Sequence, residues 1–384
     1  MEPVTTTAGQ VPQRILTVQL EDRSYPVRIG RGLIRDAVNL LPFNMQGKTL
    51  FILTDDHARP YAEDLQRVLE KATGAAAVHL FPVPPGEESK SMRWYEKVMN
   101  WLLDSGVTRQ SVLFAVGGGV VGDLGGFAAA TILRGIHLVQ IPTTLLAQVD
   151  SGVGGKTAID MKQGKNLVGA FYQPSLVLCD LNTLETLNMR QRLAGYAEII
   201  KYGFINDPEF FVWLEKNGKA VCDLEEHALA YAIETACRKK AEIVAQDERE
   251  ADVRALLNFG HTFGHALEAS VGYSDKLLHG EAVAVGMMMA LRLSQRLGYC
   301  NDEAYIRLGD HLRAMGLPTS IRDLNGIVPG DPAALVRLMY ADKKAEAGGL
   351  TFVLVKRIGE SFVARQVPEE DVLAVVLQSM HGDR

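Results

Sequence analysis

The sequence predicts an α/β domain with a largely parallel sheet, followed by a mainly α-helical domain. Three observations support this prediction. Apolar, strand-like segments alternate with helix-like segments through the first half of the chain, a pattern typical of parallel α/β sheets. A glycine cluster follows one of these strands and opens a helix. From about Met189 onward, most segments have helical periodicity.

The length of the chain also favours two domains. Its 384 residues exceed the size at which a single hydrophobic core usually stops growing. We place the boundary near residue 185, so that residues 1–185 form the α/β domain and residues 186–384 form the helical domain.

The elements of the first half follow from short apolar runs and from helical periodicity. The expected strands cover residues 14–20, 24–30, 48–56, 76–84, 111–116 and 137–144, and a further apolar run covers 176–187. The expected helices cover residues 61–73 and 91–106, and a third follows the glycine cluster. Gly106 ends the second helix, because glycine is the usual residue after a helix C-terminus.

The elements of the second half are mostly helical. The expected helices cover residues 192–205, 225–246, 256–270 and 279–298, and one strand-like segment covers 350–359. No internal repeat or low-complexity segment is present in the sequence.

The composition excludes several classes of protein. The net charge is −6 and the pI about 5.9, so the chain as a whole is not attracted to nucleic acid or to an anionic membrane. Its four cysteines are scattered without a C-x-x-C pair, which favours free thiols in a reducing compartment. Residues 1–13 lack the features of a signal peptide, and the apolar segment 281–294 is too short to span a bilayer. We therefore expect a cytoplasmic protein.

The glycine cluster indicates a nucleotide site. Gly117, Gly119 and Gly122 fit the pattern G-x-G-x-x-G, in which the backbone approaches a pyrophosphate at a helix N-terminus. The acidic residue expected about 20 positions downstream is absent. Asp55 or Asp56, at the end of an earlier strand, could replace it. Any dinucleotide site is then a variant, and a glycine-rich turn without a ligand remains the alternative.

A second glycine-rich segment resembles a P-loop but does not match it. Gly154–Thr157 reads G-G-K-T, and the position that should hold the first glycine of the motif is Asp150. We therefore exclude a P-loop NTPase. Lys156 still follows three glycines in a loop that could wrap an anion.

Two histidines suggest a metal site. His261 and His265 are four apart, so a helix would place them on one face, yet the metalloprotease pattern H-E-x-x-H is absent. A catalytic zinc site requires about three protein ligands. His279 and Glu198, the latter a carboxylate in an apolar helix, are further candidates. The alternative for each residue alone is a polar group satisfied by protein neighbours.

Polar and cationic residues surround these candidates in the sequence. Asn258 precedes His261 by three positions and Arg254 lies one turn further back, so we expect Asn258, His261 and His265 to share one helix face. The cations that accompany them are Lys201, Lys240, Lys343 and Lys344. In an acidic protein, such a set favours a small, multiply anionic substrate over a polyanion.

Nearly the whole chain resembles the 3-dehydroquinate synthase family. The resemblance is carried, in this order, by PGEESKS, GGGVVGDLGGFAAA, RGIHLVQIPTTLLAQVDSGVGGKTAID, KNLVGAFYQPSLVLCDLNTLETL, GYAEIIKYG, DEREADVRALLNFGHTFGHALE, HGEAVAVGM and DKK. The resemblance implies a Rossmann-like, NAD-binding first domain and a helical second domain that binds metal and substrate. This fold is similar to that of the glycerol dehydrogenase and iron-dependent alcohol dehydrogenase group.

The resemblance also implies the ligands of the cofactors. It makes Glu198, His261 and His279 the ligands of Zn²⁺ (or Co²⁺), whereas His265 belongs to the substrate site. The residues expected to bind NAD are Asp55, Gly86, Glu87, Lys90, Gly118, Gly119, Val120, Val121, Gly122, Asp123, Thr143, Thr144, Lys156, Lys165, Thr183, Leu184, Glu185 and Thr186.

The substrate implied by the resemblance is 3-deoxy-D-arabino-heptulosonate 7-phosphate. Its carboxylate is expected to pair with Arg254 and Lys240. The adjacent Lys239 is the alternative to Lys240. Its phosphate is expected to contact Lys156, Asn166, Arg134 and one of Lys343 and Lys344. The remaining expected substrate contacts are Asp150, Lys201, Asn258 and His265.

The implied reaction is redox-neutral overall. NAD oxidises one carbinol, phosphate leaves by elimination, the hydride returns, and the ring opens and closes again in an aldol step to give 3-dehydroquinate. In this family, the residue that corresponds to Arg134 reaches into the active site of a partner subunit. The resemblance therefore implies a homodimer. The alternatives are a related sugar phosphate cyclase acting on a substrate without a carboxylate, an NAD-dependent polyol dehydrogenase, and a non-catalytic binding protein.

Overall fold

The computed structural model describes residues 12–72, 74–250, 252–328, 330–342 and 349–382. The chain separates by its internal contacts into two compact units. Unit 1 comprises residues 1–187 and 224–248, and unit 2 comprises residues 188–223 and 249–384. The expected division at residue 185 lies close to the first of these crossings. A single boundary at residue 185 does not account for residues 224–248, which pack with unit 1. The division into two domains, 1–185 and 186–384, stays a prediction.

The described part of unit 1 is built on a seven-stranded sheet with the order β1-β2-β9-β6-β5-β3-β4. All neighbouring strands are parallel except the first pair. The strands are β1 (Arg14–Val18), β2 (Tyr25–Gly30), β3 (Thr49–Asp55), β4 (Ala77–Val83), β5 (Val112–Gly117), β6 (His137–Pro142) and β9 (Leu176–Asp180). The apolar runs of the sequence therefore form a parallel sheet, as predicted.

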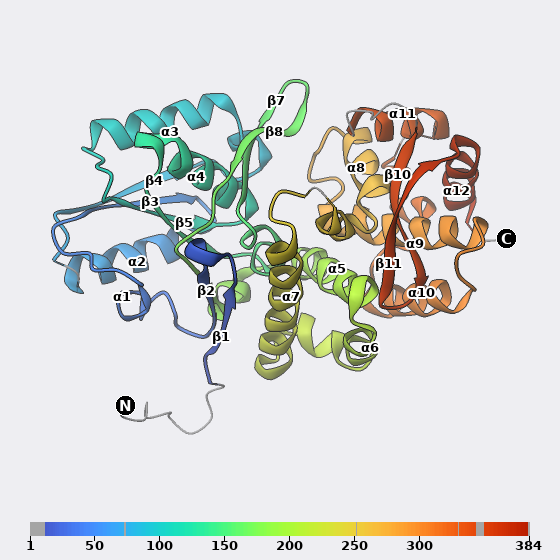
Figure 1. The fold of residues 1–384 in the computed structure, drawn as a ribbon, viewed down its shortest axis with the longest axis horizontal. Coiled ribbons are helices and arrows are strands. Elements are labelled where there is room, and N and C mark those ends of the chain that lie inside the picture. Colours follow the sequence, from blue (N-terminus) through green and yellow to red (C-terminus); the bar gives the residue numbers. More distant parts are fainter. Residues whose placement is uncertain (1–11, 73, 251, 329, 343–348, 383–384) are drawn as a thin grey trace. The chain divides into compact units, whose positions relative to one another are not determined.

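Helices cover both faces of this sheet (Figure 1). One core contains residues of α1 (Ala37–Leu40) and α2 (Arg59–Ala72), and the other contains residues of α3 (Met92–Asp104) and α4 (Gly119–Thr131). Phe51 and Phe114, on adjacent strands, belong to opposite cores and are fully buried. Burying such a side chain contributes about 1.5–3 kcal/mol, which explains why central parallel strands are apolar on both faces.

The hairpin formed by β7 (Lys156–Met161) and β8 (Gly164–Phe171) is an element that the sequence analysis did not predict. The glycines before Lys156 indicate a loop at the start of this segment. Thr157 of β7 packs directly on α4, where a Cβ added at Gly126 would lie 2.3 Å from the threonine methyl group. Contact with α4, rather than a local pattern, therefore holds this strand in place.

Unit 2 is mainly helical, and a β-hairpin packs with its helices. Its helices are α5 (Met189–Asn206), α6 (Pro208–Cys222), α8 (His261–Ser270), α9 (His279–Arg296), α10 (Glu303–Met315), α11 (Pro332–Asp342) and α12 (Glu369–His381). Its hairpin consists of β10 (Leu350–Arg357) and β11 (Glu360–Val367), the second of which was not predicted. The helix α7 (Glu226–Gln246) packs with β1 of unit 1.

One expectation about unit 2 is wrong. Asn258 does not share a helix with His261, because a short 3₁₀ segment (Val253–Asn258) ends there and α8 begins at His261. Gly260 between them has a φ of +80°, and a Cβ at this position would lie 2.7 Å from Met287 of α9. The close approach of α8 and α9 therefore requires glycine at position 260. The left-handed conformation of Gly260 also separates the 3₁₀ segment from α8, just before His261.

A bilayer-spanning helix was not expected. Among the described residues, no helix combines the length and the apolar character needed to cross a membrane.

Candidate functional site

Two histidines and a buried carboxylate form a cluster inside unit 2. Glu198 projects from α5, His261 is the first residue of α8, and His279 is the first residue of α9. Their potential ligand atoms all lie within 4.8 Å of one another. The Nε2 atoms of His261 and His279 lie 3.6 Å and 3.5 Å from Oε1 of Glu198. The side chains that the family resemblance singled out as metal ligands therefore lie together.

The spacing and chemistry of this cluster fit a catalytic zinc site. Two donors that are each about 2.1 Å from a tetrahedral Zn²⁺ lie roughly 3.4 Å apart, close to the observed separations from the Glu198 carboxylate. Two imidazoles with one carboxylate are a known donor set for catalytic zinc, which leaves a coordination position for water or substrate. Glu198 has no solvent exposure, and a buried carboxylate needs cationic partners.

The electrostatics of the cluster differ between its two histidines. Burial lowers the pKa of His261 to about 3, with Lys201 acting in the same direction and Glu198 opposing it. Burial also acts to lower the pKa of His279, but Glu268 and Glu198 outweigh it and raise that pKa to about 10. Two carboxylates therefore stabilise a positive charge beside His279, which is the setting that a divalent cation requires.

Glu268 is a residue of this site that the sequence analysis missed. Its carboxylate Oε2 lies 3.0 Å from Nδ1 of His279, and the residue is only 7% exposed. A proton on Nδ1 donated to Glu268 leaves the Nε2 lone pair directed at Glu198 and His261. The signal was present in the sequence, since Glu268 follows His261 by seven positions and so lies on the same face of α8.

His265 occupies a second group with Glu268 and His279 that also has metal-binding spacing. Its ring centroid lies 5.3 Å from that of His261 and 6.1 Å from that of His279. The side chain is half-buried, whereas His261 is buried. Its place next to the first cluster and its greater exposure suit a residue that contacts substrate.

Among the other expected substrate residues of unit 2, Lys201 and Arg254 are deeply buried and Asn258 is half-buried. Lys201 is 1% exposed and forms an ion pair with Glu198, one helical turn away on α5. Arg254 is also 1% exposed. Asn258 donates from Nδ2 to Glu250 over 2.8 Å. Lysine and arginine are rarely buried unless they are paired, so these positions are those of a polar site rather than of a solvated surface.

Most of the residues expected to bind NAD lie at one edge of the seven-stranded sheet of unit 1, whereas Lys156 and Lys165 lie on the β7–β8 hairpin. The parallel strands β3, β4, β5, β6 and β9 end there, and the strand order reverses between β3 and β5. Ligands of open α/β sheets bind outside the carboxyl ends of the strands at such a reversal. The expected residues lie at or just after these strand ends: Asp55 after β3, Gly86, Glu87 and Lys90 after β4, Gly118 to Asp123 after β5, Thr143 and Thr144 after β6, and Thr183, Leu184, Glu185 and Thr186 after β9.

Ion pairs of Lys90 with Asp123 and of Lys165 with Glu87 lie between this edge of the sheet and the β7–β8 hairpin. Lys90 is 5% exposed and forms an ion pair with Asp123 of α4. Burial acts to lower the pKa of Lys90, but Asp123 and Glu87 outweigh it and raise that pKa, so the lysine stays charged. Lys165 of β8 lies 3.3 Å from Glu87. Asp160 of β7 accepts the backbone N–H of Asn166 at 2.8 Å.

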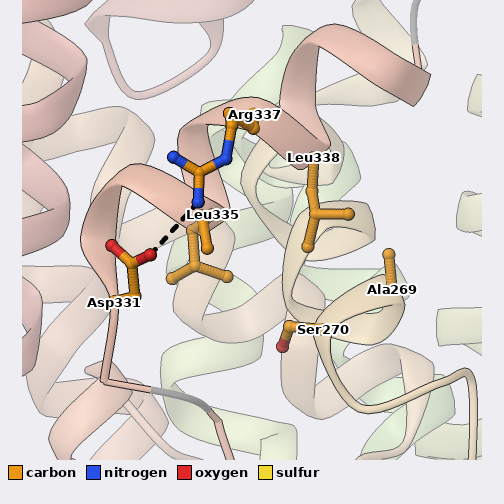
Figure 2. Close-up of a pocket in the computed structure, with 7 residues that line it drawn as sticks. Ala269, Ser270, Asp331, Leu335, Arg337 and Leu338 are labelled. Carbon is orange, nitrogen blue, oxygen red and sulfur yellow. Dashed lines mark hydrogen bonds and ion pairs between the residues drawn. The ribbon is translucent and has the colours of Figure 1, made fainter.

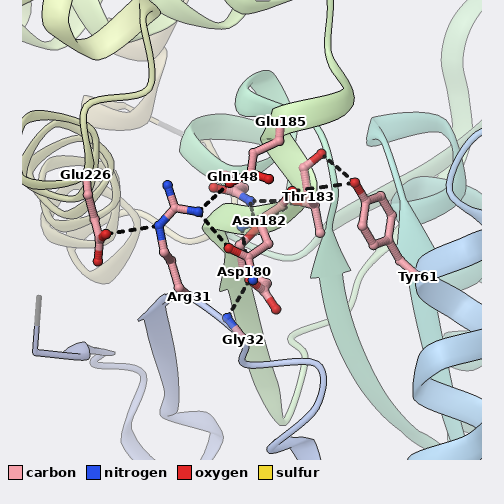
Figure 3. A network of polar contacts seen from close by, with 9 residues as sticks. All are labelled: Arg31, Gly32, Tyr61, Gln148, Asp180, Asn182, Thr183, Glu185 and Glu226. Carbon is pink, nitrogen blue, oxygen red and sulfur yellow. Dashed lines mark hydrogen bonds and ion pairs between the residues drawn. The ribbon is translucent and has the colours of Figure 1, made fainter. Parts of the chain in front are cut away.

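A hydrogen-bond network holds the segment after β9 (Figure 3). The guanidinium of Arg31 lies 2.5 Å from Glu185, 2.7 Å from the side-chain oxygen of Asn182 and 3.0 Å from Glu226 of α7. The hydroxyl of Tyr61 donates to the carbonyl of Thr183 at 3.4 Å. Arg31 thus holds two side chains of the segment Leu181–Thr186 and Tyr61 holds one of its carbonyls, although neither residue was predicted as a site residue.

Asp150 and Lys240 form a second polar pair in unit 1. The Nζ of Lys240 donates to the Asp150 carboxylate at 2.7 Å and to its carbonyl at 2.6 Å. Lys240 is 6% exposed, whereas Lys239 is half-buried and lies 3.7 Å from Glu242 on its own helix. This difference favours Lys240 over Lys239 as a site residue.

The remaining expected residues lie in more exposed segments or outside the described ones. Lys156, Asn166 and Arg134 are exposed, and Asn166 and Arg134 have φ values of +58° and +68°. Arg134 lies between α4 and β6, in a 3₁₀ turn (Ile132–Arg134). Lys343 and Lys344 lie outside the described residues.

A separate pocket of about 420 Å³ in unit 2 contains none of the expected site residues (Figure 2). Apolar side chains from the end of α8 and from α11, among them Leu335 and Leu338, line most of it. Its arginine, Arg337, pairs with Asp331 at 3.1 Å.

Comparison with solved structures defines the class of protein. A 2-deoxy-scyllo-inosose synthase complexed with carbaglucose-6-phosphate, NAD⁺ and Co²⁺ superposes with a TM-score of 0.84 at 24% identity, covering 95% of this chain and 100% of that one. A 2-epi-5-epi-valiolone synthase from Streptomyces hygroscopicus, with NAD⁺ and Zn²⁺ bound, gives 0.83 at 27% identity, covering 95% and 99%. A probable glycerol dehydrogenase from Sinorhizobium meliloti gives 0.62 at 18% identity, covering 91% and 95%. The fold is that of sugar phosphate cyclases and glycerol dehydrogenases.

Sequence comparison identifies the family within this class. The models of the N-terminal and C-terminal parts of 3-dehydroquinate synthase match residues 80–194 and 195–345. The 3-dehydroquinate synthase of Rhodospirillum rubrum is 50% identical over 363 residues, which cover 94% of each chain. The chain belongs to the 3-dehydroquinate synthase family, the phosphate-eliminating lyases of the shikimate pathway.

Proposed function

We propose that the chain converts 3-deoxy-D-arabino-heptulosonate 7-phosphate to 3-dehydroquinate and phosphate, with NAD and a resident Zn²⁺ or Co²⁺ ion as cofactors. The observation that carries this proposal is the cluster of Glu198, His261 and His279, whose atoms have the spacing of zinc ligands. Relatives of this fold with bound NAD⁺ and Zn²⁺ or Co²⁺ support the choice of cofactors.

Each cofactor would supply one kind of chemistry. A metal ion held by the three ligands would act as a Lewis acid on adjacent substrate hydroxyls. NAD bound at the carboxyl edge of the sheet would accept a hydride and give it back, so that the reaction is redox-neutral.

The side chains of unit 2 would bind and orient the substrate around the metal site. Lys201, held beside Glu198, would donate hydrogen bonds to a ring hydroxyl. The buried guanidinium of Arg254 would bind the carboxylate in a bidentate manner. His265 would exchange a proton with a hydroxyl, because it borders the cluster without belonging to the proposed ligand set.

The side chains of unit 1 would bind the cofactor and the phosphate. Lys90 and Asp123, paired in the interior, would fix the nicotinamide end of NAD. Lys156 and Asn166, both on the β7–β8 hairpin, would contact the phosphate group. Lys240 would contact the carboxylate and hold Asp150 toward a hydroxyl. The carboxylate-binding roles proposed for Lys240 and for Arg254 each favour this substrate over those of the related cyclases, which lack a carboxylate.

We further propose a homodimer in which Arg134 completes the site of the partner subunit. Arg134 and Leu133 have left-handed backbone conformations with φ values of +68° and +50°. Strained backbone at an exposed turn often marks a functional contact. Mixing inactive Arg134→Ala chains with inactive Lys201→Ala chains should restore activity in heterodimers. Confirmed subunit exchange without recovered activity would exclude this arrangement.

An assay of phosphate release tests the proposed substrate and cofactors together. We expect one phosphate per molecule of the C7 substrate, loss of activity after chelation, and recovery with Zn²⁺ or Co²⁺. Substoichiometric NAD should be sufficient. Absence of release from the C7 substrate would contradict the substrate, and activity that survives both chelation and removal of NAD would contradict the cofactors.

A further inference from the structure

A cavity of about 480 Å³ in unit 2 lies apart from the metal cluster. Three arginines from separate elements line it: Arg292 of α9, Arg313 of α10, and Arg322 of the 3₁₀ segment Ile321–Leu324. Arg292 follows His279 by thirteen positions on the same helix, which corresponds to about 20 Å along its axis. The cavity is therefore distinct from the candidate metal centre.

The lining of the cavity has an excess of positive charge. Its acidic member, Asp323, accepts the backbone N–H of Thr319 at 2.9 Å and of Ser320 at 3.0 Å, in addition to the Thr319 hydroxyl at 2.9 Å. These local bonds stabilise the Asp323 carboxylate and lower its pKa, against the opposing effect of burial. Three guanidinium groups thus share a pocket with one carboxylate, which already accepts hydrogen bonds from Thr319 and Ser320.

The arginines are positioned in different ways. Arg292 is half-buried, stacks 4.0 Å from the ring of Tyr305, and donates to Gln295 at 3.1 Å. Arg322 donates to the carbonyl of His381 at 3.3 Å. Arg313 pairs with Asp310 at 2.7 Å, but both side chains of this pair are more than half exposed. An exposed pair of this kind is weak, so the guanidinium can turn to another anion at little cost.

The floor of the cavity is apolar. Met288, Met289 and Val375 contribute to its lining and are 2%, 2% and 1% exposed. Methionine side chains adapt to ligands of varied shape, and Tyr305 offers an aromatic face at the wall. Ser379 accepts the N–H of Ile321 at 2.9 Å, which leaves its hydroxyl hydrogen to donate to a ligand.

We propose that this cavity is a second binding site, which takes a small organic anion with a carboxylate or phosphate head group and a compact apolar body. The head group would lie among Arg292, Arg313 and Arg322, and the body would contact the methionine floor. Guanidinium groups recognise both kinds of head group through paired N–H donors. The proposal does not depend on the assignment of the metal or NAD site.

Titration calorimetry with phenyl phosphate, benzoate and inorganic phosphate tests the proposal on the full-length protein. Phenyl phosphate and benzoate should each bind at this site more tightly than inorganic phosphate, because only they reach the apolar floor. The variant Arg313→Gln/Arg322→Gln should weaken this binding at least ten-fold. Arg337→Gln, which removes an exposed arginine outside the cavity, should leave it within two-fold of the parent.

Binding of these anions at the proposed substrate site must be separated from binding at the cavity. Lys156→Gln should weaken substrate-site binding and leave the cavity event intact, while the double arginine variant should keep normal turnover. The proposal is overturned if no event responds to the double variant, if Arg337→Gln causes an equal loss, or if inorganic phosphate binds the cavity as tightly as phenyl phosphate.

Discussion

Glu268 contacts His279 at the atom that does not face the other proposed ligands. This hydrogen bond of 3.0 Å selects the tautomer of the imidazole and its orientation. Removing a carboxylate that hydrogen-bonds a metal-binding histidine typically weakens metal binding by about 10- to 100-fold.

We predict that Glu268→Ala weakens Zn²⁺ binding by roughly ten-fold or more, while Glu268→Gln, which can still accept from Nδ1, retains more of the affinity. Competition against a chromophoric chelator measures this without any assay of activity. Glu303→Gln, at an exposed carboxylate of α10 that pairs with Arg307, is the control. Equal affinities for Glu268→Ala and the parent protein would show that this carboxylate does not orient the ligand.

The two histidines of α8 should differ in their effects. His261→Ala should lose metal and activity together, because His261 is one of three proposed ligands. His265→Ala should retain the metal and lose turnover. Metal analysis of the two purified variants distinguishes them, and an equal loss of metal would show that the roles are assigned wrongly.

Residue spacing alone could predict part of this site. It indicates His261 and His265 as a pair, because they are four apart, and it indicates Glu198 as a costly acid in an apolar helix. It cannot show that His279, at the start of another helix, approaches Glu198 to 3.5 Å. That choice of ligands came from the family resemblance. Glu268 was missed although the same reasoning as for Glu198 applies to it.

At the scale of elements, the β7–β8 hairpin carries a half-buried aspartate, Asp160, whose pKa is raised. Burial raises the pKa of Asp160 to about 6, with Glu87 acting in the same direction and the Asn166 N–H opposing it. In the unfolded chain the pKa of an aspartate is about 3.9. Between about pH 4 and 6 the folded state therefore holds a proton that the unfolded state has lost, so this group contributes less to stability as pH rises.

We predict that Asp160→Asn raises the free energy of unfolding at pH 7.5 by roughly 1 kcal/mol after allowance for solvent screening at this half-buried site. At pH 4 the variant and the parent should be equal. Asparagine keeps an oxygen acceptor for Asn166. Urea unfolding across this pH range measures the effect, with the exposed Asp104→Asn as control. If the free energy of unfolding of Asp160→Asn does not exceed that of the parent at pH 7.5, the raised pKa of Asp160 does not destabilise the folded protein.

The segment Leu181–Thr186 gives a prediction for cofactor binding. Arg31 holds it through Asn182 and Glu185 and connects it to Glu226 on α7. We expect Arg31→Ala to raise the KM for NAD about ten-fold, the effect of losing roughly 1.4 kcal/mol, with a smaller change in kcat. Arg31→Lys should recover part of the loss, and Arg35→Ala, an exposed neighbour, should have no effect. A loss confined to kcat would contradict a positioning role.

The elements themselves were predictable to different degrees. The strands β1 to β6 and helices α2 and α3 match apolar runs and helical periodicity. The strands β7, β8 and β11 were not predicted. Pairing between β7 and β8, packing of β7 on α4, and pairing of β11 with β10 hold them in place. The break before α8 was missed because Gly260 is required by the approach of α9, a contact distant in sequence.

At the scale of the molecule, the chain passes between its two compact units more than once. Residues 1–187 belong to unit 1, residues 188–223 belong to unit 2, residues 224–248 return to unit 1, and residues 249–384 belong to unit 2. The returning helix α7 brings Lys240 to Asp150. A boundary read from a change in sequence character could not show this return, since α7 is as helical as its neighbours.

For the whole reaction, we propose that NAD is reduced and reoxidised within each turnover. The most direct test follows a substrate deuterated at the carbon that is oxidised, with NAD in catalytic amount. We predict one phosphate per substrate, no build-up of NADH in the steady state, and full retention of deuterium in the product. Stoichiometric NADH, or loss of the label to solvent, would show that the hydride does not return and would contradict the account.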